Sequence, residues 1–244
     1  MKLSPQERAA RRAAFRQMDA WQKTEYLFTY YKVPILLGLI LLVILCSSVR
    51  HRMTKKEAAL YAAMVNVSVG ESLERQLTVE FLDWSGENVQ KKEVYLYRDL
   101  YLSDDASVTS HEYAYASRLK LLGAINAKKL DVVLMNREGY AILSRSGYLW
   151  DLSDLLHTDG ELRRRLAPYL SENEVVIEDN AIEYNLNEAP SYQETTAVVA
   201  NAVEVSSLPA FQAVGFSDSV YLGIIANSTR SECALRYLAY LLDR

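Results

Sequence analysis

Seven residues of the chain stand where a ligand would be recognised if the chain folds as an open parallel sheet. Such sheets bind ligands beyond the carboxyl ends of their strands. Amide, guanidinium and hydroxyl groups there can hydrogen-bond a polar solute or a peptide, and nearby aromatic rings can form a wall. The residues are Asn66, Gly70, Asn136, Arg137, Tyr140, Ser206 and Ser207, with Tyr148 and Trp150 extending the wall.

The same residues also have a purely structural interpretation. Polar residues that follow a strand often cap the next helix, and tyrosines often pack against a sheet. The sequence leaves both interpretations open.

Catalytic chemistry finds little support in the residue types and their spacing. His51, His111 and His157 are the only histidines, and none lies in a nucleophile or metal motif. Asp104 and Asp105 are adjacent in a polar stretch, which is typical of a solvated turn rather than of paired catalytic carboxylates. Because a glycine-rich phosphate loop is also missing, we expect no enzymatic activity, no cofactor and no metal ion.

The elements that would position these residues alternate between strands and helices. Apolar runs with strand character cover residues 60–69, 93–98 and 130–136, and helical periodicity lies between them. This order, β-α-β-α-β, predicts a single α/β lobe with a mostly parallel sheet covered by helices.

The second half of the domain is less regular. Residues 174–185 suggest a hairpin that turns at Asp179–Asn180, a favourable turn pair. Further strands are expected in 199–207 and 219–228. The box Thr229-Arg230-Ser231-Glu232 then predicts the start of a closing helix.

Residues 33–49 form an uncharged apolar run of 17 residues, at the short end of the roughly 17–25 residues that span a bilayer. A cleaved signal peptide fits poorly, since no A-x-A-like site follows the run. A lipoprotein signal also fits poorly, because Leu45 precedes Cys46 where lipid-modified cysteines have a small residue. We therefore expect one uncleaved transmembrane helix.

Charge is divided unevenly around this run. Residues 1–32 hold seven basic and three acidic residues, whereas the chain from Glu57 onward holds 16 basic and 28 acidic residues. This asymmetry predicts a cytoplasmic tail (1–32), a transmembrane helix (33–49), a juxtamembrane linker (50–58) and an extracytoplasmic domain (59–244) in the cell membrane. The tail is either an amphipathic helix on the inner leaflet or a solvated basic segment, and the acidic domain argues against nucleic-acid binding.

Two stretches carry a resemblance to a known class of proteins. "RLKLLGAINAKKLDVVLMNREGYAILSRSGYLWDLSDLL" (118–156) and "VYLGIIANSTRSECALRYLAYLL" (220–242) resemble extracellular solute-binding proteins of bacterial transporters. The whole layout from "EYLFTYYKVP" onward resembles a group of uncharacterised, single-pass membrane-anchored proteins of Gram-positive bacteria. The resemblance implies a periplasmic-binding-protein-like lobe, although solute-binding proteins have two lobes and this chain has room for one.

Two functions follow as expectations. The first is a membrane-tethered binding domain, similar to a reduced solute-binding protein, that recognises a small molecule or a peptide without catalysis. The alternative is an accessory or sensor subunit whose domain docks a membrane-protein partner. A polar cleft at the strand ends would favour the first function, and an exposed apolar patch without a cleft would favour the second.

Overall fold

A computed structural model of the chain describes residues 19, 21, 32–54, 56–105, 111–186 and 191–244. The chain divides into two compact units, Met1–Lys55 and Lys56–Arg244. The first unit contains helix α3 (Lys32–Thr54), whose apolar side chains such as Leu37, Leu41 and Ile44 are exposed. Within the described part of the chain, no helix combines the length and the apolar character needed to cross a membrane. The predicted tail helix lies outside the described residues.

The second unit is an α/β domain built on one six-stranded sheet. Its strands are β1 (Glu57–Val65), β2 (Lys92–Leu100), β3 (Val132–Asn136), β4 (Leu170–Asp179), β5 (Glu194–Glu204) and β6 (Val220–Ile224), in the order β2-β1-β3-β6-β5-β4. The first three strands are parallel, and β6, β5 and β4 are each antiparallel to their neighbours. The prediction of a mostly parallel sheet is therefore wrong. Strands β4 and β5 form an antiparallel hairpin, and β6 lies antiparallel between β3 and β5. The sheet is mixed.

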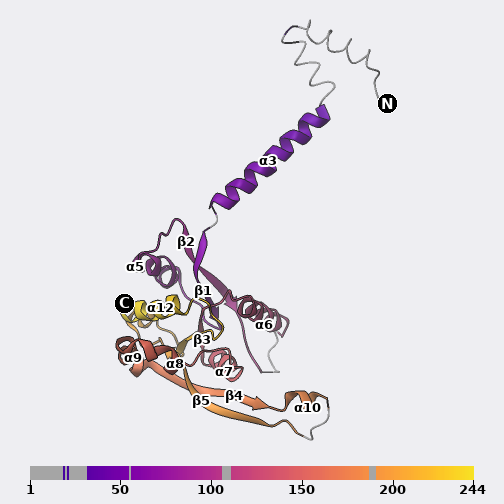
Figure 1. Ribbon diagram of the computed structural model, residues 1–244. Coiled ribbons are helices and arrows are strands. Elements are labelled where there is room, and N and C mark those ends of the chain that lie inside the picture. The colour runs from indigo at the N-terminus through magenta and orange to yellow at the C-terminus, as the bar shows by residue number, and fades with distance from the viewer. Residues whose placement is uncertain (1–18, 20, 22–31, 55, 106–110, 187–190) are drawn as a thin grey trace. The chain divides into compact units, whose positions relative to one another are not determined.

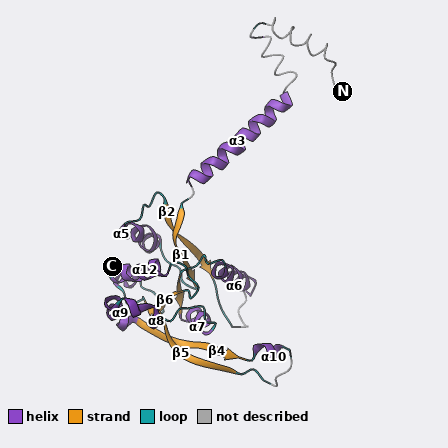
Figure 2. Ribbon diagram, viewed as in Figure 1, coloured by secondary structure: helices purple, strands orange, loops and turns teal. Residues whose placement is uncertain are grey.

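Helices cover both faces of the sheet (Figure 2). One face packs against α4 (Glu71–Arg75), the π-helical turn η1 (Gln76–Glu80), α5 (Phe81–Trp84), α8 (Leu152–Leu155), α9 (Gly160–Leu166), α11 (Pro209–Gln212) and α12 (Ser231–Leu242). The other face packs against α6 (His111–Asn126) and α7 (Arg137–Arg145). Short 3-10 turns, η2 (Leu156–Thr158) and η3 (Ala167–Tyr169), follow α8 and α9, and α10 (Ala181–Asn185) lies between β4 and β5.

Strand β3 lies inside the sheet and supplies core side chains to both layers. Val132 and Leu134 join one apolar cluster, and Val133 and Met135 join the other. This alternation explains why the sequence of the strand is a continuous apolar run rather than a polar–apolar pattern.

Three local predictions need correction. The first strand ends at Val65 rather than Val69, because Asn66 turns the chain with a positive φ of 56°. The closing helix begins at Ser231, and its N-cap residue Arg230 makes no side-chain cap. The predicted linker (50–58) is shorter than expected, since α3 continues through Thr54 and β1 begins at Glu57.

The predicted hairpin turn at Asp179–Asn180 is also wrong. Asn180 instead closes a longer connection that contains α10. Its side-chain oxygen accepts from the Gln193 backbone at 2.7 Å, and its amide donates to the Ser191 carbonyl at 2.9 Å. Asn180 therefore does stabilise a turn of the chain, but the connection that it closes is longer than the predicted hairpin turn.

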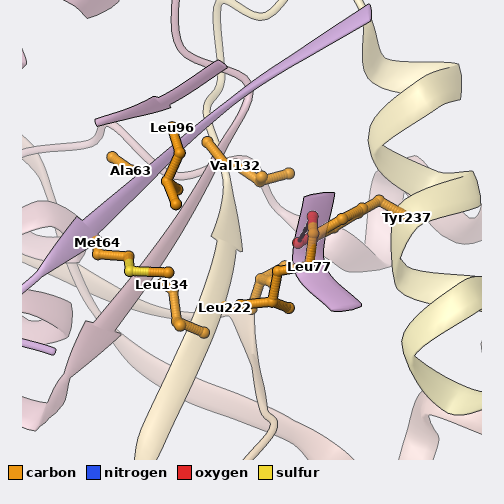
Figure 3. Close-up of a pocket in the computed structure, with 9 residues that line it drawn as sticks. Ala63, Met64, Leu77, Leu96, Val132, Leu134, Leu222 and Tyr237 are labelled. Atoms are coloured by element: carbon orange, nitrogen blue, oxygen red, sulfur yellow. Dashed lines mark hydrogen bonds between the residues drawn. The ribbon is translucent and has the colours of Figure 1, made fainter. Parts of the chain in front are cut away.

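Two tyrosines of α12 support the π-helical turn η1. The Tyr237 hydroxyl donates to the Leu77 carbonyl at 2.9 Å, and the Tyr240 hydroxyl donates to the Gln76 carbonyl at 2.8 Å. They provide partners for backbone carbonyls where the α-helical pattern is interrupted. Burial raises the pKa of Tyr237, which keeps its hydroxyl protonated as a donor. Figure 3 shows the Tyr237 contact beside a small apolar cavity of about 10 Å³.

We expect Tyr237→Phe to lower the free energy of unfolding by about 1–3 kcal/mol, because the buried Leu77 carbonyl loses its hydrogen-bond partner. Urea unfolding of the full chain in non-ionic detergent measures the change. Tyr115→Phe is the control, since Tyr115 is exposed and should show no loss. Equal stability of the two variants would contradict this account of η1.

Candidate functional site

The carboxyl ends of β1, β3 and β5 lie at one edge of the sheet, as the sequence predicts. Val65 pairs with Met135, and both Met135 and Glu204 pair with Tyr221 of β6. Asn66, Asn136 and Ser206 follow these strands at the same edge. The topology therefore brings three of the predicted binding segments together.

The two asparagines at this edge bond to each other and to the backbone. The Asn66 amide donates to Asn136 Oδ1 at 3.2 Å and to the Leu102 carbonyl at 2.6 Å, and its oxygen accepts from the Leu102 N–H at 2.8 Å. Asn136 Oδ1 also accepts from the Gly139 N–H at 2.9 Å and so caps α7. A solute at this edge would therefore meet an Asn66 amide and an Asn136 oxygen that already have partners.

Gly139 is required for this close arrangement. A Cβ atom there would lie 3.1 Å from Val65 Cγ1 and 3.2 Å from Met135 Cβ. The glycine thus lets the first turn of α7 pack directly on β1 and β3.

The remaining predicted residues at the edge have local roles or are exposed. Gly70 is the N-cap residue of α4, and Arg137 is the exposed first residue of α7. The Ser206 hydroxyl donates to Glu204 Oε1 at 3.0 Å, and the Ser207 carbonyl accepts from Gln212 Nε2 at 2.7 Å. These contacts order the turn after β5 and the start of α11.

Tyr140 belongs to a buried polar group between α7 and the β4–β5 hairpin. Its hydroxyl lies 2.8 Å from the Ser171 carbonyl and 2.9 Å from Asn201 Oδ1. The Asn201 amide donates to Ser144 Oγ at 2.8 Å, and that hydroxyl donates to the Glu174 carbonyl at 2.9 Å. Ser144 and Asn201 are fully buried. Burial raises the pKa of Tyr140, so the hydroxyl stays protonated.

The predicted aromatic wall is not formed. Tyr140 stacks on Tyr221 with ring centroids 4.7 Å apart, and Tyr148 packs against the same apolar cluster. Trp150 packs against the cluster on the opposite face of the sheet. Tyr148 and Trp150 would share a face in a regular extended segment, but here they pack into apolar clusters on opposite faces of the sheet.

The feature that sequence reasoning missed is an arm formed by residues 172–200, which comprises most of β4, α10 and the first part of β5. Strand β5 pairs with β6 at Val203 and Glu204, and the hairpin continues beyond this point to α10 (Figure 1). Large apolar side chains on the arm are between 45% and 74% exposed. They are Ile177, Ile182, Tyr184, Leu186, Tyr192 and Val198.

The arm is also strongly acidic. Its sequence holds seven acidic residues (Glu172, Glu174, Glu178, Asp179, Glu183, Glu188 and Glu194), and residues 166–229 contain no Lys, Arg or His. Arg145 of α7 forms ion pairs with Glu194 and, at 3.8 Å, with Glu174. The long stretch without a basic residue is the sequence signal that could have pointed to this surface.

A groove of about 590 Å³ lies elsewhere, between the edge strand β2 and the helical stretch from α4 to α5. Two of the basic residues that line it form ion pairs, Arg98 with Glu74 and Lys92 with Glu87 at 2.9 Å. Within the described ranges, no three His, Cys, Asp or Glu side chains are grouped closely enough to hold a metal ion.

Comparison with protein-family models, with curated proteins and with solved structures found no match to the chain. The resemblance to solute-binding proteins therefore stays a prediction from sequence, and the site must be interpreted from its own geometry.

Proposed function

We propose that the α/β domain is an interaction module that docks a partner protein through the arm. The single observation that carries this proposal is the set of exposed Ile, Leu, Val and Tyr side chains on the arm. Contiguous exposed apolar surface on a soluble domain is typical of a protein–protein contact. Of the two functions expected from sequence, this is the accessory-subunit alternative.

The solute-binding function has less support from the described geometry. A binding cleft needs polar groups that point toward the ligand, yet the Asn66 amide and the Asn136 Oδ1 atom are bonded to each other and to the backbone. Tyr140, which was expected to line the cleft, is buried against the hairpin instead.

The proposal includes a membrane tether, which rests on the uncharged run at 33–49 and on the basic residues around it. A tether would hold the domain near partners in the same membrane and raise their effective concentration.

Docking through the arm predicts position-specific cross-linking. We expect a photo-cross-linking residue at Ile182, in the full chain in intact cells, to give an adduct of one discrete mass. The same residue at Leu119, an exposed apolar position on α6, is the control and should give none. Val198→Asp should abolish the adduct from Ile182, because it places a charge among the apolar side chains. An adduct that forms equally from both positions, or no adduct from the arm, would contradict the proposal.

The tether predicts a defined topology. In a chain carrying Cys46→Ser and Cys233→Ser, a membrane-impermeant maleimide added to intact cells should label Ile182→Cys but not Ala10→Cys. Both positions should be labelled after the cells are opened. Labelling of Ala10→Cys alone in intact cells would reverse the topology, and equal labelling of both would argue against a membrane-spanning anchor.

A further inference from the structure

We propose that the partner presents a cationic segment that carries lysine or arginine together with apolar residues on one face, and that this face lies on the outer face of the arm. This inference rests on the proposed docking function and specifies the chemistry of the partner. It is carried by the pairing register of the arm and by its charge.

The register divides the side chains of the arm between two faces. Glu172 pairs with Ala200, Glu174 with Val198, and Val176 with Thr196, so these three cross-strand pairs share one face. The inner face is turned toward α7. There a Cβ atom on Gly147, just after α7, would lie 4.0 Å from Val175 Cγ1, and Asn201 bonds to Ser144.

The outer face thus combines carboxylates with apolar side chains. Glu172, Glu174 and Val198 are exposed there, and Val198 has 65% of its surface accessible. Ile177 is the extra residue of a β-bulge and is likewise exposed, so it extends the apolar surface toward α10. A partner segment that presents cationic and apolar side chains on the same face would place each type opposite a complementary one.

Charge selects the partner among the candidates for this face. Glu172 and Glu183 form no ion pair within the described ranges, and the arm has no basic residue of its own. A second copy of the arm would bring like charges together, which opposes association. An anionic lipid surface would repel the arm in the same way. A cationic protein segment instead gains both charge complementarity and apolar contact.

The probe that tests this inference is a fluorescein-labelled nine-residue peptide of the sequence KKVVKKVVK, which presents both lysine and valine on each face when extended, added to the full chain in non-ionic detergent. We expect it to bind at least tenfold more tightly than a glutamate–valine peptide or a lysine–serine peptide, as measured by fluorescence anisotropy. Binding should weaken as NaCl is raised from about 50 to 500 mM, because salt screens exposed charges.

Variants of the chain locate the binding surface. The pair Glu172→Lys and Glu174→Lys should weaken binding of the lysine–valine peptide at least tenfold, and Val198→Ser should weaken it severalfold. The control pair Asp83→Lys and Asp218→Lys changes the net charge equally at exposed positions off the arm and should bind as the unaltered chain does. Equal loss in both pairs, or binding that ignores the arm, would overturn the inference.

Two further outcomes separate the alternatives. Binding to phosphatidylglycerol vesicles that is lost in Val198→Ser would identify lipid as the ligand and overturn the inference. If the Ile182 cross-link forms but no lysine-containing peptide binds, the partner chemistry is wrong while docking through the arm stands. If the cross-link also fails, the proposed function fails as well.

Discussion

The buried hydrogen-bonded group of Tyr140, Ser144 and Asn201 is the interaction on which the arrangement of the arm depends. Strand β5 joins the sheet through two paired positions with β6, and a two-stranded hairpin that continues beyond its sheet is only marginally stable in water. Helix α7 supplies the missing support, because its hydroxyl groups bond to the Asn201 side chain and to carbonyls of β4. Asn201 can enter this group since it is the extra residue of a β-bulge, where the register shifts between Ser171 and Glu172. Loss of one of these three side chains would leave buried polar atoms without hydrogen-bond partners, which lowers the free energy of unfolding by about 1–3 kcal/mol.

This constraint also determines which surfaces are available for recognition. By covering the inner face of the hairpin, α7 leaves the outer face with its carboxylates and apolar side chains accessible. The start of the same helix is held at the strand-end edge by Asn136, whose oxygen serves both Gly139 and Asn66. Two of the polar side chains that could recognise a solute at the strand ends, Asn66 and Asn136, thus help to position α7. This is one reason why we favour a protein partner at the arm over a solute at the strand ends.

The sequence predicted the first half of the domain well and the second half poorly, for physical reasons. Strand β3 and the helices around it have strong local periodicity, so the β-α-β-α-β order and the shared edge of Asn66 and Asn136 could be predicted. The antiparallel half depends on contacts that no local pattern records. Asn180 closes a loop to Gln193 where a tight turn was expected, and Tyr140 meets Asn201, which lies 61 residues further along the chain. The sequence singled out Asn180 and Tyr140 as polar residues of interest, but their hydrogen-bond partners could not be predicted from the spacing of residues along the chain.

Hydrogen–deuterium exchange on the full chain tests most directly whether this buried group supports the arm. We compare the unaltered chain with Asn201→Leu, which removes the shared partner of Tyr140 and Ser144, and with Asn126→Leu at the exposed end of α6 as the control. The account predicts that amides in 173–176 and 196–200 exchange at least tenfold faster in Asn201→Leu, while amides of β1 and β3 keep their protection in both variants. Unchanged exchange in the arm, or an equal increase across the whole sheet, would contradict it.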